Sequence, residues 1–188
     1  MAYSKVGDEE LLSKILQVFR TYGNEGATLS RISEATGLEK ASLYHRFPGG
    51  KRDMVRTVVE SVHEWFGENV IHPLDAKGSP ADRLHRVLRN LRKFYQGGRN
   101  SCLLDTLSLP AVEGRLDRAL RESLLAWLEG FARIAKASGF SERAARERAQ
   151  DAIVSIEGAL VLVRVLHDTK PFERALDRLA ETLIKMEK

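Results

Sequence analysis

The spacing of apolar residues is the feature that most restricts how this chain can fold. They recur every three or four positions through almost all of the 188 residues, which is the spacing of the buried face of an α-helix. β-Branched residues fall inside these periods, and no polar/apolar alternation lasts more than a few positions, so strand signals are almost absent. The sequence therefore predicts an all-α protein, and its 43% hydrophobic content suffices for a packed core.

Turn-forming residues divide this pattern into successive helices. Two short helices after the first are separated at Gly37, and the second of them is closed by Pro48-Gly49-Gly50 because proline and paired glycines interrupt helical hydrogen bonding. A longer helix begins about Lys51, and a turn-rich stretch, residues 71–80, separates it from the helices that follow. We expect two domains, residues 1–50 and 51–188, joined by that long helix.

The segment TLSRISEATGLEKASLYHRFPGGK, residues 28–51, is typical of a helix-turn-helix. Gly37 can take the positive φ of a tight turn, while Leu38 and Leu43 fill the interior of the elbow. With Leu43 and Phe47 turned inward, the period of 3.6 residues leaves one side of the second helix free for DNA. That side carries Lys40, Ala41, Ser42, Tyr44 and His45.

Both ends of this elbow offer groups that bind phosphate. Thr28 has the position of an N-cap at the start of one helix, and Lys51 lies at the start of another, where free backbone N–H groups attract anions. Residues 28–56 hold six Lys or Arg against three acidic residues. This local charge of +3 is modest, so we expect salt-sensitive binding through two such modules. The formal net charge of the whole chain is +4, which allows an anionic partner without requiring one.

The segment from Glu10 to Val59 resembles the N-terminal DNA-binding domain of the TetR family of bacterial transcriptional regulators. The residues that match the family pattern are Thr28, Ile32, Ala35, Gly37, Leu43, Tyr44 and Phe47. The Pro-Gly-Gly-Lys turn is one residue longer than the commoner turn, as in a multidrug-repressor-like branch. The resemblance implies a ligand-responsive repressor that binds a palindromic operator as a homodimer. It also implies operator contacts from Thr28, Lys40, Ala41, Ser42, Tyr44, His45 and Lys51.

The stretch 152–166 is apolar nearly all round, so both sides of that helix need to be covered. One covering is a four-helix interface between two copies of the chain, formed with the last helix. Small residues would allow the close approach: Ala152, Ser155, Gly158 and Ala159. The alternative is a central helix enclosed by its own domain, and the family resemblance favours the dimer.

The second domain is also predicted to hold a pocket for a small apolar or aromatic effector. Its candidate lining residues are Trp65, Phe66, Leu91, Tyr95, Leu104, Leu107, Trp127, Phe131, Glu157 and Val161. Polar anchors would come from Arg92, Asp105, Glu157 or Arg164. The alternative is that these residues are simply core.

Other functions are less well supported by the residues. Sequence signatures of an enzyme, such as G-x-S-x-G or a P-loop, are missing, and the dispersed histidines suggest neither a metal site nor a cofactor. A helical protein–protein adaptor without DNA binding remains the alternative function.

The single cysteine and the N-terminus bear on the cellular setting. Cys102 cannot form an internal disulfide, which favours a reducing cytoplasm. We expect it to be a small buried hydrophobe, with a redox sensor or a pocket residue as alternatives. The N-terminus lacks the pattern of a signal peptide, and residues 152–166 are too few to span a membrane.

Overall fold

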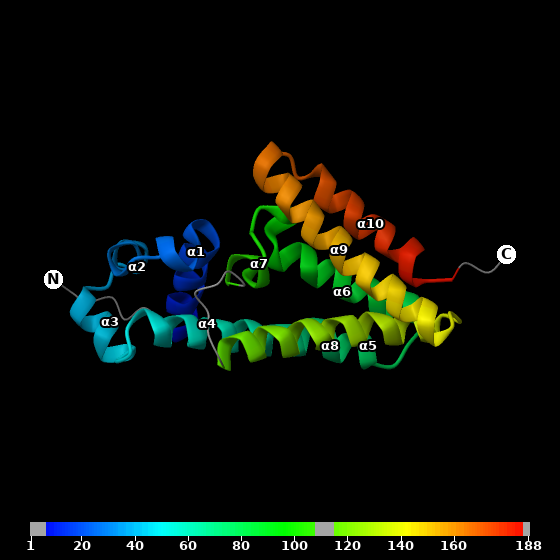
Figure 1. Cartoon of the computed structure of the whole chain (residues 1–188), viewed down its shortest axis with the longest axis horizontal. Coiled ribbons are helices and arrows are strands. Elements are labelled where there is room, and N and C mark those ends of the chain that lie inside the picture. Colours follow the sequence, from blue (N-terminus) through cyan, green and yellow to red (C-terminus); the bar gives the residue numbers. More distant parts are fainter. Residues whose placement is uncertain (1–6, 108–114, 186–188) are drawn as a thin grey trace.

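The computed structural model describes residues 7–107 and 115–185, except for the side chains of residues 104, 107, 115–117 and 119. Within these ranges it contains helices and connecting segments but no strand, which confirms the all-α prediction (Figure 1). The helices are α1 (Asp8–Gly26), α2 (Leu29–Thr36), α3 (Lys40–Arg46), α4 (Lys51–Phe66), the π-helical η1 (Gly67–Ile71), α5 (His72–Asp75), α6 (Pro80–Phe94), the 3₁₀-helical η2 (Gln96–Gly98), α7 (Leu103–Leu107), α8 (Arg115–Ala137), α9 (Glu142–Leu166) and α10 (Lys170–Leu183).

The N-terminal bundle consists of α1, α2, α3 and the first part of α4. Apolar positions spaced three or four residues apart on each helix meet in one core, as expected of amphipathic helices. Ile15, Phe19, Ile32, Leu43 and Met54 are fully enclosed in it. This core fixes the angle between α2 and α3, the two helices of the helix-turn-helix.

α4 runs from the N-terminal bundle into the C-terminal half and continues through η1 into α5. The helical path therefore extends to Asp75, and the non-helical break predicted for residues 71–80 is confined to residues 76–79. Pro73 lies within this path, directly after the π-helical turn. The Asn69 carbonyl, four residues before it, accepts a hydrogen bond from Asn90 Nδ2 at 2.8 Å instead. Ser79 caps α6 by accepting a hydrogen bond from the Asp82 N–H at 3.1 Å.

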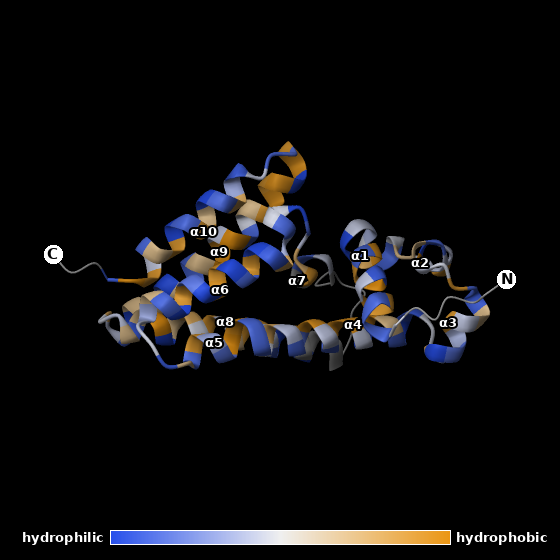
Figure 2. Cartoon of the chain, turned by 180° about the vertical axis from the view of Figure 1, so that it is seen from behind, coloured by the Kyte–Doolittle hydropathy of each residue, from blue (hydrophilic) through white to orange (hydrophobic). Residues whose placement is uncertain are grey.

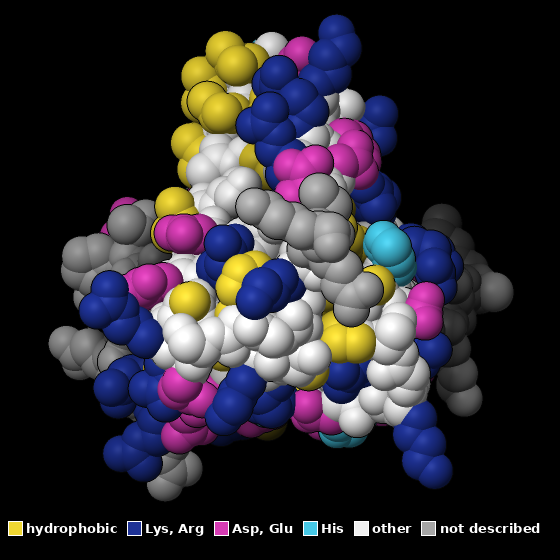
Figure 3. Space-filling model, turned by 90° about the vertical axis from the view of Figure 1, so that its right-hand side faces the viewer, with side chains coloured by type: hydrophobic (Ala, Val, Ile, Leu, Met, Phe, Trp, Pro, Cys, Tyr) yellow, Lys and Arg dark blue, Asp and Glu magenta, His cyan; other side chains and the backbone are white. Residues whose placement is uncertain are grey.

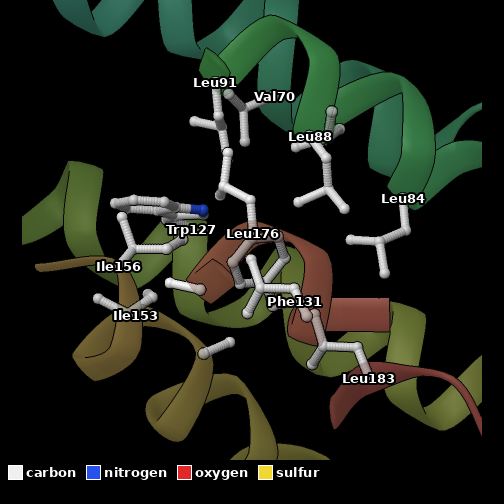
Figure 4. Close-up of a cluster of buried hydrophobic side chains, with 14 of the residues drawn as sticks. Val70, Leu84, Leu88, Leu91, Trp127, Phe131, Ile153, Ile156, Leu176 and Leu183 are labelled. Carbon is white, nitrogen blue, oxygen red and sulfur yellow. The ribbon is translucent and has the colours of Figure 1, made fainter. Parts of the chain in front are cut away.

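The C-terminal bundle packs α6, α8, α9 and α10 around a second core (Figure 4). Trp127 and Phe131 of α8 meet Leu91 of α6 and Leu176 of α10 there, and all four are almost completely buried. Arg92 closes the seam between α6 and α10, with its Nε 2.7 Å from Glu173 Oε2 and a second ion pair to Asp177.

The two cores meet where α4, α7 and α8 come together. Leu103 of α7 and Leu120 of α8 belong to the N-terminal core, whereas Trp65 and Phe66 of α4 pack against the C-terminal core. Helices of the second half therefore dock directly on the helix-turn-helix bundle. No helix in the part of the chain that the structure describes is both long and apolar enough to cross a bilayer.

Candidate nucleic-acid interface and ligand pocket

Local hydrogen bonds fix the geometry of the helix-turn-helix. The Arg31 N–H donates to Thr28 Oγ1 at 3.3 Å, so Thr28 caps α2 as its residue type favours. Gly37 ends α2 with φ 73°, a left-handed conformation that suits glycine. The Ser33 hydroxyl then donates to the Leu38 carbonyl at 2.6 Å, which ties α2 to the start of α3. The elbow is therefore held by both packing and hydrogen bonds.

The outer side of α3 is polar and open. Lys40, Ala41, Tyr44 and His45 are exposed and Ser42 is half-buried, while Leu43 is fully buried. Tyr44 is 48% exposed, and its ring lies against the backbone at Gly50, where a β-carbon would come within 3.3 Å of Tyr44 Cε1. The glycine-rich turn thus lets α4 begin close to Tyr44.

Several basic side chains near the elbow already have partners. Arg46 pairs with Asp8 of α1 at 2.9 Å, and Arg31 donates to the Gly26 carbonyl at 2.7 Å. Lys51 is half-buried and donates to the Asn24 carbonyl at 2.8 Å. An ammonium group has three donors, so this bond still leaves Lys51 able to reach a phosphate. Lys40 and Arg52 have no ion pair or side-chain hydrogen bond within the described residues.

A pocket lies between α4, α6, α7 and α8, at the junction of the two cores. It holds about 440 Å³ of space, including the part open to solvent. Its walls are almost entirely apolar, and His63 Nδ1 and Ser123 Oγ lie 2.7 Å apart across it, linking α4 to α8. The lining residues are Val59, Val62, His63, Phe66, Phe94, Tyr95, Cys102, Leu103, Leu120, Ser123 and Trp127.

The residues predicted from the sequence to line a pocket fall into several groups. Phe66, Tyr95 and Trp127 line the pocket. Leu91 and Phe131 point into the C-terminal core, where neither is exposed at all, and Trp65 stacks on Phe94 behind the pocket wall. The side chains of Leu104 and Leu107 lie outside the described residues.

The sequence reasoning missed much of the wall that α4 provides. Val59, Val62 and His63 line the pocket together with Phe66. Their spacing of three, one and three residues continues the apolar stripe of α4, and that periodicity is the signal that would have found them. Leu103, Leu120 and Ser123 were missed as well.

Glu157 and Val161 line a second, smaller cavity on the other side of Cys102. It holds about 180 Å³ between α7 and α9, and Asp105 and Arg164 form an ion pair of 3.0 Å beside it. Cys102 borders both cavities. Of the predicted polar anchors, Arg92 lies away from both because its ion pairs hold it in the seam between α6 and α10.

Burial dominates the electrostatics around Cys102. It raises the pKa of the thiol to about 12, with a further contribution from nearby Glu157, and it raises the pKa of Tyr95 well above the usual value. Burial also raises the pKa of Glu157. The Tyr95 hydroxyl lies 3.5 Å from Cys102 Sγ. Cys102 is therefore a buried, protonated thiol with little nucleophilic character at neutral pH.

One face of α9 is apolar and exposed. Its large side chains are Val154, Val161, Leu162, Val165 and Leu166, with exposed fractions from 41% to 69%. We call these five residues the α9 apolar face. Near the C-terminal end of α9, hydrophobic residues gather on the ribbon in Figure 2 and on the upper part of the surface in Figure 3.

The small residues predicted to contact a partner chain divide between the two sides of α9. Ser155 and Gly158 lie among the α9 apolar face and are exposed. Ala152 and Ala159 are 0% and 6% exposed and face the chain's own core. Their spacing continues the inward stripe of Ile156 and Val163, so the expectation of a partner contact for these two alanines is corrected.

Among the residues that the structure describes, no group of three or more His, Cys, Asp or Glu side chains could hold a metal ion.

Comparison with known proteins identifies both halves of the chain. Residues 80–178 match "Transcriptional regulator LmrA/YxaF-like, C-terminal domain", and residues 11–58 match "Bacterial regulatory proteins, tetR family". The HTH-type transcriptional regulator LmrA of Bacillus subtilis is 27% identical over 87% of this chain and 89% of its own length. The uncharacterized HTH-type transcriptional regulator Rv0196 of Mycobacterium tuberculosis is 23% identical over 94% and 93%, respectively.

Solved structures share the fold. A TetR transcriptional regulator from Legionella pneumophila has a TM-score of 0.81 at 16% identity, covering 97% of this chain and 100% of that chain. The regulatory protein TetR from Rhodobacter sphaeroides has a TM-score of 0.78 at 19% identity, covering 96% and 100%. These structures share an N-terminal helix-turn-helix domain followed by a helical C-terminal domain. The chain belongs to the TetR family of helix-turn-helix transcriptional regulators.

Proposed function

We propose that this regulator is a ligand-responsive repressor that binds a palindromic operator as a homodimer and is released by a small apolar or aromatic effector. In this proposal residues 1–50 bind DNA and residues 51–188 bind the ligand and dimerise, in the cytoplasm. The observation that carries it is the position of the apolar pocket, at the junction between the helix-turn-helix core and the C-terminal core.

DNA binding is assigned to the outer side of α3 and the two ends of the elbow. Lys40 and Ser42 reach base edges or phosphates, and Tyr44 and His45 donate to phosphate oxygens. Ala41 offers a methyl group to an apolar contact with thymine. Thr28 and Lys51 place helix N-termini and an ammonium group against the backbone on either side. The rigid elbow supports this assignment because α3 needs a fixed angle to enter a major groove.

Dimerisation is assigned to the α9 apolar face. Five large apolar side chains on one helix, together with exposed Ser155 and Gly158, favour close packing against a second helix. A twofold axis through this face would pair two copies of α3 for half-sites about 34–36 Å apart, or a multiple of that distance.

Release from DNA is assigned to the pocket. Its walls take residues from α4, α7 and α8 that belong to the N-terminal core, such as Val59, Leu103 and Leu120, and Trp127 from the C-terminal core. A ligand that widens the pocket therefore separates the two cores and changes the distance between the two reading helices. If the ligand binds this separated arrangement more tightly than the DNA-bound arrangement, its binding lowers the affinity of the protein for DNA.

A gel-shift assay on DNA upstream of the protein's own gene tests this function. We expect a complex that dissociates at high salt, and that is also released by at least one compound in a panel of apolar, aromatic and cationic molecules. A ligand that binds the native state also raises the melting temperature. A purified, folded protein that forms no complex on any DNA fragment would instead favour the adaptor function.

A further inference from the structure

The ring of Phe94 is held between two helices that belong to different parts of the molecule. It stacks on Trp65 of α4, with ring centroids 4.3 Å apart and an interplanar angle of 24°. The guanidinium carbon of Arg20, on α1, lies 4.4 Å from the same centroid. If the Trp65 ring and the Arg20 guanidinium both lay this close to the centroid on the same face of Phe94, their atoms would overlap, since contacting carbon atoms stay about 3.5 Å apart. Phe94 is therefore sandwiched between Arg20 and Trp65.

Arg20 has no other strong partner in this position. Arg20 is only 8% exposed, and its Nε and Nη2 atoms are buried and donate no hydrogen bond to any residue the structure describes. Burial lowers the pKa of the guanidinium from its usual value. A buried charge without a counter-charge is unfavourable, so the π face of Phe94 is the principal stabilising contact of this cation.

Phe94 is also part of the pocket wall. Its ring makes edge contacts with two other wall residues, Phe66 at 5.2 Å and 88° and Tyr95 at 5.1 Å and 86°. A molecule that enters the pocket touches this aromatic group directly. Any shift of the Phe94 ring then changes the contact made by Arg20, on the first helix of the DNA-binding bundle.

We infer that Arg20 is a positioning residue that couples the DNA-binding bundle to the pocket through Phe94. This inference rests on the proposed function for its biological meaning, but the contact itself does not. With the pocket empty, the Arg20–Phe94–Trp65 stack holds α1 in one orientation against α6. When a ligand displaces the Phe94 ring, Arg20 loses its π face, and α1 is released from the pocket wall.

The first test requires neither ligand nor DNA. Arg20→Met retains the long apolar stem and removes the charge, whereas Phe94→Leu retains an apolar side chain and removes the ring. Hydrogen exchange of the α1 amides should be faster by about tenfold in each variant, because the desolvated cation–π contact outweighs the cost of burying the charge, with α9 unchanged. Exchange of the α1 amides in the double variant should be no faster than in either single variant, because both substitutions remove the same contact.

The matched control is Arg148→Met. Arg148 lies 4.0 Å from the centroid of Phe140, so this change removes the same kind of contact within the C-terminal half, and exchange in α1 should stay at the wild-type rate. Arg20→Lys, which keeps a cation, should restore slower exchange. Wild-type exchange of α1 in Arg20→Met, or additive effects in the double variant, would overturn the inference.

A second measurement separates this inference from the proposed function. The probe is 1-anilinonaphthalene-8-sulfonate, titrated with and without a palindromic fragment selected from random DNA by the wild-type protein. We expect the fragment to weaken dye binding to the wild type and to Arg148→Met, and to leave dye binding to Arg20→Met unchanged. If the fragment weakens dye binding to Arg20→Met as much as it weakens dye binding to the wild type, the role of Arg20 is contradicted. Absence of antagonism in the wild type contradicts the proposed release mechanism and the coupling role together, while the exchange experiment still decides the contact.

Discussion

Replacing Val165 with glutamate tests the α9 apolar face as the dimer interface. Val165 is 67% exposed in the single chain, and a dimer through this face would bury that surface. In a twofold dimer the same substitution enters the interface from both chains. The change should therefore separate the chains without affecting the core of either one.

The magnitude follows from the area that Val165 leaves exposed. Full burial of a valine side chain stabilises by about 1.5–3 kcal/mol, so two thirds of that area contributes about 1–2 kcal/mol per chain and about 2–4 kcal/mol per dimer. Since each 1.4 kcal/mol is a factor of ten, the dimer Kd should rise about 30- to 1,000-fold. Desolvation of two carboxylates weakens the dimer further.

Sedimentation equilibrium over a range of protein concentrations measures this change. Leu125→Glu is the matched control, because Leu125 is 42% exposed but belongs to α8 and not to the α9 apolar face. The control should remain dimeric, and both variants should keep the helical circular dichroism of the wild type. An unchanged dimer Kd for Val165→Glu, or equal dissociation of both variants, would show that α9 does not form the interface.

Three further changes have defined outcomes. Lys40→Ala should weaken operator binding and lower the slope of log K against log salt by about one per chain; an unchanged slope in filter-binding assays would remove Lys40 from the phosphate contacts. The pKa of Cys102, raised from 9.0 to about 12, predicts a native alkylation rate by iodoacetamide at pH 8 about a thousandfold below that of the urea-unfolded chain. Because this pKa is raised in the folded state, its stabilising effect is present below pH 9 and is lost as the pH rises toward 12. Urea titrations should therefore show stability falling with pH in that window, less steeply in Cys102→Ala, and equal slopes would contradict the buried thiol. Gly37→Ala places a β-carbon on a backbone with φ 73° and should lower the free energy of unfolding by about 1–2 kcal/mol, whereas no change in the urea midpoint would mean that the turn adapts.

The helix-turn-helix could be predicted from the sequence because its determinants are local. A cap at Thr28, a left-handed turn at Gly37 and inward leucines at 38 and 43 all act within a few residues of one another, and the structure has each of them. The α9 helix was predicted equally well, because its apolar stretch is long. Its inward and outward small residues could not be separated, because small side chains occur on both faces.

The pocket was harder to predict because it depends on long-range packing. Trp127 and Phe131 are four residues apart on the same face of α8, yet only Trp127 reaches the pocket. The arrangement of α4, α6, α7 and α8 around the pocket separates the two, and the sequence does not contain that information in local form. Arg20 was missed as well, although it follows Leu12 and Leu16 at intervals of four and so continues a partly buried stripe.

The most direct test of the central claim is a footprint of the protein on DNA that it has itself selected, combined with the mass of the complex. We predict two chains, or a multiple of two, per palindromic fragment, with protected major grooves about 34–36 Å apart or a multiple of that spacing. Loss of both protections in Lys40→Ala would assign them to α3. A complex with one chain and one protected groove, or a failure to enrich any sequence, would contradict a dimeric operator-binding regulator.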